Sequence, residues 1–129
     1  MSNELYQTGL SIRREVIGDQ YVDRALATAD AFGAPLQELV TEYCWGAVWG
    51  REGLDRKTRS LLNLGMLAAL NRPAELKLHI RGAVRNGASE AEIREALLQV
   101  TVYCGVPAGV EAFRIAREAL REVAAEGTR

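Results

Sequence analysis

The sequence has few of the residues on which redox and metal sites usually depend. Among 129 residues it has two cysteines, Cys44 and Cys104, and one histidine, His79. The cysteines do not form a C-x-x-C pair, and one histidine cannot complete a Cys/His zinc set. We therefore expect no metal site. A disulfide between the two cysteines is conceivable, but two buried thiols are favoured in a cytosolic chain of this size.

The sequence also lacks a surplus of charge and a long apolar run. Its 16 basic and 17 acidic residues give a net charge of -1, whereas a dedicated nucleic-acid binder carries a basic surplus. The longest stretch without a charged residue, 96–110, is shorter than the roughly 20 apolar residues of a membrane span. The N-terminus has neither the basic nor the apolar region of a signal peptide. We expect a cytoplasmic protein that binds neither nucleic acid nor membrane.

No segment alternates apolar and polar residues long enough to predict a β-strand. Apolar residues instead recur at helical spacing, which predicts an all-α fold. We expect a single domain, residues 1–129, whose first 20 residues form an N-terminal arm anchored by Ile12 and Val16. The predicted helices are 21–32, 35–48, 55–71, 73–86, 89–104 and 110–123.

Local signals support several of these boundaries. Pro73 suits the first turn of a helix, Gly87 suits the position after a helix end, and Ser89 with Glu92 has the spacing of a capping box. Residues 61–70 are apolar on almost every face, and such a helix has to be surrounded by protein. Because one small domain offers few neighbours, this segment points to a homo-oligomer.

His79 is the first candidate for chemistry, because an imidazole can transfer protons near neutral pH. Glu75 precedes it by one helical turn and could orient the ring, although an ordinary surface pair has the same spacing. Lys77, Arg81 and Arg85 also recur every fourth residue. This basic stripe could hold an anion but is more typical of a solvated face.

A second group of candidates lies near the end of the helix at 35–48. Trp45 and Trp49 are separated by one turn and could form the wall of a pocket, although such pairs usually pack in a core or an interface. Glu42 lies in the same mostly apolar helix, where a carboxylate needs a partner or a raised pKa. The basic groups at Arg13 and Arg14, and at Arg56, Lys57 and Arg59, could clamp carboxylates. They are more typical of plain surface.

Six segments, in order along nearly the whole chain, resemble the carboxymuconolactone decarboxylase family and in particular its 4-carboxymuconolactone decarboxylases. These segments are RREVIGDQYVDR at 13–24, YCWG at 43–46 with Trp49, GLDRKTRSLL at 53–62, ELKLHIR at 75–81 with Asn86 and Gly87, EIREALLQ at 92–99, and YCGVP at 103–107. The resemblance implies the alkylhydroperoxidase-D-like superfamily, whose all-helical subunits assemble as ring-shaped trimers or hexamers. We expect a hexamer. The redox members have a C-x-x-C before the histidine, where this chain has Arg72 and Glu75, so thiol peroxidase chemistry is not expected.

The resemblance also implies a reaction, namely cofactor-free decarboxylation of 4-carboxymuconolactone to 3-oxoadipate enol-lactone in the protocatechuate branch of the β-ketoadipate pathway. Loss of CO₂ sends electrons into the lactone carbonyl, so the protein must stabilise an oxyanion and protonate the ring. We assign His79 as proton donor or oxyanion partner, with Glu75 or Glu42 setting its protonation state.

For substrate binding we assign a group of aromatic and basic residues: Trp45, Trp49, Arg51, Arg59 and Arg81. Arginine suits the carboxylate arm of the lactone acid, and Arg51 and Arg59 near the tryptophan pair favour an acid-binding pocket. Two alternatives remain open. One is a family member that acts on another lactone or keto acid, and the other is a non-catalytic oligomer that binds a small acid.

Overall fold

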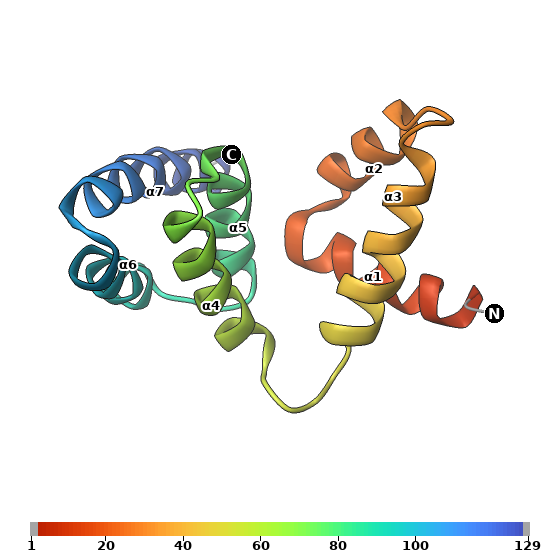
Figure 1. The fold of residues 1–129 in the computed structure, drawn as a ribbon, viewed down its shortest axis with the longest axis horizontal. Helices are drawn as coiled ribbons and strands as arrows, with labels where there is room; N and C mark the ends of the chain where they lie inside the picture. The colour runs from red at the N-terminus through yellow and green to blue at the C-terminus, as the bar shows by residue number, and fades with distance from the viewer. Residues whose placement is uncertain (1–2, 128–129) are drawn as a thin grey trace. The chain divides into compact units, whose positions relative to one another are not determined.

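The computed structural model describes residues 3–127, and this part of the chain contains helices and no strand (Figure 1). The predicted all-α fold class is confirmed. The helices form two compact units, the first ending at Asp55 and the second beginning at Arg56. The single-domain boundary and the ring-shaped assembly stay predictions. None of the described helices is long and apolar enough to cross a membrane.

The first unit contains α1 (Asn3–Ile17), α2 (Asp19–Thr28), α3 (Ala34–Leu39) and the π-helix η1 (Val40–Val48), which follows α3 without a break. Helices were expected at 21–32 and 35–48, but the helix α1 within the arm was not. Its buried residues nevertheless recur at helical spacing along one face of α1. They are Gly9, Ile12, Arg13, Val16 and Ile17.

Helix α1 packs along η1 with almost no space between the two backbones. A Cβ atom added at Gly9 would lie 1.9 Å from the carbonyl oxygen of Thr41, and one added at Gly46 would lie 2.7 Å from that of Leu5. Both distances are far below van der Waals contact. Only glycine at these two positions allows this close packing of α1 and η1.

The second unit contains α4 (Arg56–Ala69), α5 (Pro73–Arg85), α6 (Glu90–Cys104) and α7 (Val106–Gly127). The predicted capping box is present, since Ser89 and Glu92 each accept a hydrogen bond from the other's backbone N–H. Gly87 follows α5 with φ of 92°, as expected of a residue after a helix end. Side chains from all four helices form the core, with Leu64, Leu76, Ile80, Ile93 and Leu97 the largest among its fully buried members.

Ion pairs join α5 to α7 along the surface of this unit. Lys77 Nζ lies 2.8 Å from Glu118 and 2.7 Å from Glu122. Arg81 pairs with Glu122 at 3.3 Å and also with Glu126. Much of the basic stripe predicted on α5 therefore connects two helices, which agrees with the interpretation of this stripe as a surface feature.

The exposure of two groups of side chains differs from what the sequence indicated. Leu62 and Met66 on α4 and Leu70, the residue that follows it, recur at intervals of four residues and are 50%, 52% and 63% exposed, so the second unit does not surround this helix by itself. The expectation of buried thiols was wrong, because Cys44 and Cys104 are both exposed. Cys104 is the last residue of α6, and Cys44 follows Tyr43 on an exposed part of η1.

Candidate active site

The first unit contributes four of the predicted site residues. Glu42, Trp45 and Trp49 come from η1 and the residue that caps it, and Arg51 lies exposed in the segment that follows. Glu42 is half-buried, whereas the tryptophans are 4% and 6% exposed. Their rings stack with centroids 4.8 Å apart and an angle of 28° between the planes. The two indoles thus form one rigid apolar element at the end of η1, the helix that also carries Glu42.

The local backbone of this segment is unusual. The backbone N–H of Trp49 donates to the carbonyl of Cys44 at 3.0 Å, a bond that spans five residues where an α-helix would span four. Such π-helical turns are rare and occur frequently at functional sites, because the wider turn redirects the side chains. This π-helix contains Glu42 and Trp45 and is capped by Trp49, which makes η1 a candidate for part of an active site.

The second unit contributes His79, which is half-buried on α5. Nδ1 of its ring lies 3.4 Å from the side-chain amide nitrogen Nδ2 of Asn63 on α4. Burial lowers the pKa of His79 from 6.5 to about 4, although the charge of Glu75 acts in the opposite direction. The imidazole is therefore neutral at neutral pH. With Asn63 donating to Nδ1, its proton is carried by Nε2.

The remaining predicted residues of this unit have different surroundings. Glu75 is exposed in the first turn of α5, and its effect on His79 acts through its charge. Arg59 is half-buried on α4. Arg81 already binds two carboxylates of α7, so a substrate carboxylate would have to compete with them. The predicted residues thus fall into two groups, Glu42, Trp45, Trp49 and Arg51 in the first unit, and Arg59, Glu75, His79 and Arg81 in the second.

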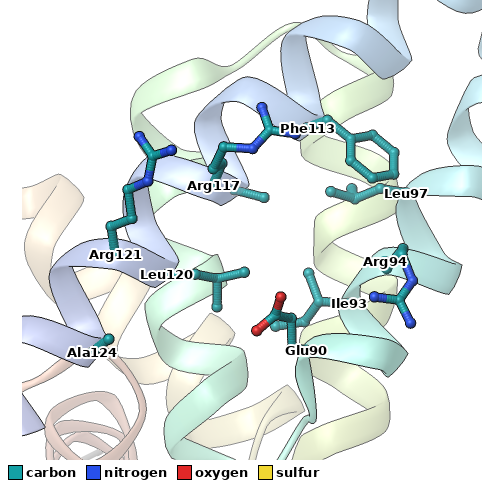
Figure 2. Close-up of a pocket in the computed structure, with 10 residues that line it drawn as sticks. Glu90, Ile93, Arg94, Leu97, Phe113, Arg117, Leu120, Arg121 and Ala124 are labelled. Atoms are coloured by element: carbon teal, nitrogen blue, oxygen red, sulfur yellow. The ribbon is translucent and has the colours of Figure 1, made fainter.

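A cavity of about 550 Å³ lies in the second unit between α6 and α7. In Figure 2, Ile93 and Leu97 from α6 and Phe113 and Leu120 from α7 border this space, together with charged side chains at its edge. The charged residues are Glu90, Arg94, Arg117 and Arg121. Its volume is typical of small-molecule sites. None of the catalytic or substrate-binding residues predicted from the sequence lines this cavity.

Within residues 3–127 the structure contains no group of three or more His, Cys, Asp or Glu side chains able to hold a metal ion.

Sequence reasoning missed one residue of these environments and misjudged the burial of another. Asn63 contacts His79 from a neighbouring helix, and no sequence spacing connects the two residues. Arg13 was considered as a possible carboxylate clamp but interpreted as more typical of plain surface, whereas it is 4% exposed and bonded to α3 and η1. A signal for Arg13 was available, because it shares a helical face with apolar residues of α1.

Comparison with known proteins identifies the family. The model of the carboxymuconolactone decarboxylase family matches residues 34–118. The chain is 45% identical to nitrosuccinic acid decarboxylase npaB of Metarhizium robertsii over 127 residues, which are 98% of this chain and 89% of the relative. It is 37% identical to 4-carboxymuconolactone decarboxylase of Acinetobacter baylyi over 118 residues, which are 92% of this chain and 88% of the relative.

The helical fold and these matches define the class of protein as an all-α carboxy-lyase. The chain belongs to the carboxymuconolactone decarboxylase family.

Proposed function

We propose that the protein decarboxylates 4-carboxymuconolactone to 3-oxoadipate enol-lactone without a cofactor, as a cytoplasmic step of aromatic catabolism by the β-ketoadipate pathway. The observation that carries this proposal is the alignment with a 4-carboxymuconolactone decarboxylase over 92% of the chain. Nitrosuccinic acid is the second candidate substrate, and the 45% identity to a nitrosuccinic acid decarboxylase over 98% of the chain favours it.

The two candidate substrates place the same demands on an active site. Each has a carboxylate on a carbon whose electrons can move into an oxygen acceptor, the lactone carbonyl in one case and the nitro group in the other. Each also retains a second carboxylate after CO₂ leaves. An enzyme for either substrate must therefore bind the retained carboxylate, stabilise negative charge that develops on oxygen, and deliver one proton to carbon.

His79 suits the second of these tasks. A neutral imidazole with its proton on Nε2 can donate a hydrogen bond to a developing oxyanion. Its lowered pKa makes the imidazolium scarce at neutral pH, which favours the role of oxyanion partner over that of proton donor. We propose that the proton comes from solvent and that Glu42 is the acid–base group that relays it, and we retain Trp45 and Trp49 as the apolar wall against which the substrate packs.

Parallel assays of the two substrates test this proposal. Purified protein is incubated with 4-carboxymuconolactone or with nitrosuccinate, and consumption of substrate and release of CO₂ are followed by NMR and by a coupled assay. We expect 4-carboxymuconolactone to have the higher kcat/KM. A higher value for nitrosuccinate would replace the first candidate with the second. Turnover of neither substrate by folded protein would contradict the proposal.

A further inference from the structure

Arg13 is a buried cation bonded to neutral groups. Its Nη1 donates to Oε1 of Gln37 at 3.0 Å and to Oγ1 of Thr41 at 3.2 Å, and its Nε is buried and makes no hydrogen bond within the described residues. The ionisable groups that act on it through space are two phenols and a thiol, those of Tyr6, Tyr21 and Cys44. Within residues 3–127, no carboxylate compensates its charge.

The adjacent residue shows how the same side chain is accommodated at the surface. Arg14 pairs with Asp19 at 3.3 Å and with Asp23 at 2.7 Å. Removing a guanidinium from water without a counter-ion is costly, and burial accordingly lowers the pKa of Arg13. Hydrogen bonds to an amide and a hydroxyl compensate for part of this loss. The planar guanidinium retains donors that match the two oxygens of a carboxylate.

The surroundings of Arg13 connect it to the candidate active site. Thr41, which holds Nη1, is fully buried and directly precedes Glu42 on η1. Trp45 follows Thr41 by four residues on the same helix. The close contact of α1 with η1 at Gly9 and Gly46 fixes the position from which Arg13 extends. The guanidinium is therefore held by the same π-helix that carries the carboxylate and the first tryptophan.

We propose that Arg13 binds the retained carboxylate of the substrate and is thus a specificity-determining residue for small dicarboxylic acids. This inference rests on the proposed function, because both candidate substrates keep one carboxylate. Arg13 suits the retained group better than the leaving one. An ion pair with the leaving carboxylate would stabilise the ground state and would be lost as CO₂ forms, which opposes the reaction.

Succinate is the probe for this site, because it carries two carboxylates and lacks the electron acceptor that decarboxylation requires. Its Kd is measured by calorimetry for the parent protein and for Arg13→Met, Arg13→Lys and Arg14→Met. A charge-assisted hydrogen-bond pair predicts a Kd about 10–100-fold higher for Arg13→Met. Arg13→Lys should lose part of the affinity, because an ammonium cannot form the bidentate pair. Arg14→Met, the matched control, should stay within about twofold because its charge is paired at the surface.

Turnover and melting temperature distinguish binding from a structural role. With the substrate that the enzyme accepts, Arg13→Met should raise KM much more than it lowers kcat. Its melting temperature should equal or exceed that of the parent, because an uncompensated buried charge has been removed. A lower melting temperature together with unchanged succinate affinity and KM would identify Arg13 as a structural residue and overturn the proposal.

Two further measurements keep the proposal testable if Arg13→Met does not fold. The NMR signal of the Arg13 Nε–H should shift when succinate is added to the parent protein, and a signal that stays in place overturns the proposal.

The double variant Arg94→Gln, Arg117→Gln tests whether succinate binds instead in the cavity between α6 and α7. Loss of succinate binding in that variant would move the site there. None of the succinate experiments requires turnover, so failure of the proposed reaction and failure of the Arg13 site give different results.

Discussion

Asn63 and His79 join α4 to α5 through an amide nitrogen and a ring nitrogen 3.4 Å apart. The contact orients an imidazole that burial keeps neutral. An unfolded chain leaves the ring in water, where its pKa has the ordinary value. The two states therefore bind a proton to His79 with different affinity, and stability depends on pH.

The first prediction concerns this dependence. Between the ordinary pKa of 6.5 and the folded value of about 4, the unfolded state binds the proton and the folded state does not. The contribution of His79 to stability is thus complete above pH 6.5 and is lost as the pH falls toward 4. The full loss is about 3 kcal/mol. Urea unfolding of the parent and of His79→Gln at a series of pH values should show the stability difference moving in favour of the variant as the pH falls. A difference that stays constant with pH would contradict the prediction.

The second prediction concerns catalysis by His79. If its Nε2–H stabilises the oxyanion, His79→Ala should lower kcat by roughly 10²–10³-fold and change KM much less. The rate and the melting curve are measured on one preparation, since a purely structural histidine would affect the latter alone. A folded variant with kcat within about threefold of the parent would exclude His79 from the mechanism. Glu42→Gln would then be tested next.

The third prediction concerns protonation of the product. Reaction of 4-carboxymuconolactone in heavy water should place one deuterium on the carbon next to the lactone carbonyl, because the new C–H bond takes its hydrogen from solvent or from an exchanging group. NMR of the isolated enol-lactone measures this directly. A product without deuterium at that carbon would exclude the dienolate route.

The fourth prediction concerns the contact between α1 and η1. Gly9→Ala should destabilise the protein by at least about 3 kcal/mol, because the new methyl group would overlap the carbonyl oxygen of Thr41. Gly65→Ala is the matched control. Apart from its chain neighbours and the backbone of its own helix, no heavy atom lies within 4 Å of a Cβ added at Gly65 in α4, so alanine there should stabilise the helix by about 0.5–1 kcal/mol. Chemical unfolding of the two variants should give changes of opposite sign.

The fifth prediction concerns assembly. The exposed apolar row on α4 and the resemblance to ring-forming proteins predict a homo-oligomer, most simply a hexamer. Light scattering at micromolar concentration measures its mass. Leu62→Glu with Met66→Glu should reduce that mass while leaving the helical signal in circular dichroism intact. A parent protein that scatters as a monomer of 14.1 kDa would refute the predicted assembly.

The helices of the second unit could be predicted from the sequence because their signals are local. Pro73, Gly87 and the Ser89–Glu92 capping box act within one turn of the residues they terminate. Helix α1 was not predicted because Arg13 interrupts the row of apolar residues on its buried face. The π-helical turn of η1 was not predicted either, since the apolar residues of 40–48 have the same spacing as in an ordinary α-helix.

The candidate site was predictable to a smaller extent, for a similar reason. His79 could be selected because it is the only histidine, but its neutral state depends on burial and its orientation on Asn63 from another helix. The stacking of Trp45 and Trp49 follows from their spacing along one helix. The importance of Arg13 depends on the absence of a nearby carboxylate, which no pattern in a linear sequence reveals.

The tight contact of α1 and η1 limits how this enzyme can change in evolution or by design. Most helix pairs can move apart or slide slightly when a side chain between them grows, and such shifts are a common route to a new substrate range. Here Gly9 and Gly46 bring main chain against main chain, so the spacing cannot be adjusted in small steps. A change of specificity in this unit therefore requires substitution of side chains that lie outside this contact, because the two helices keep a fixed position relative to each other.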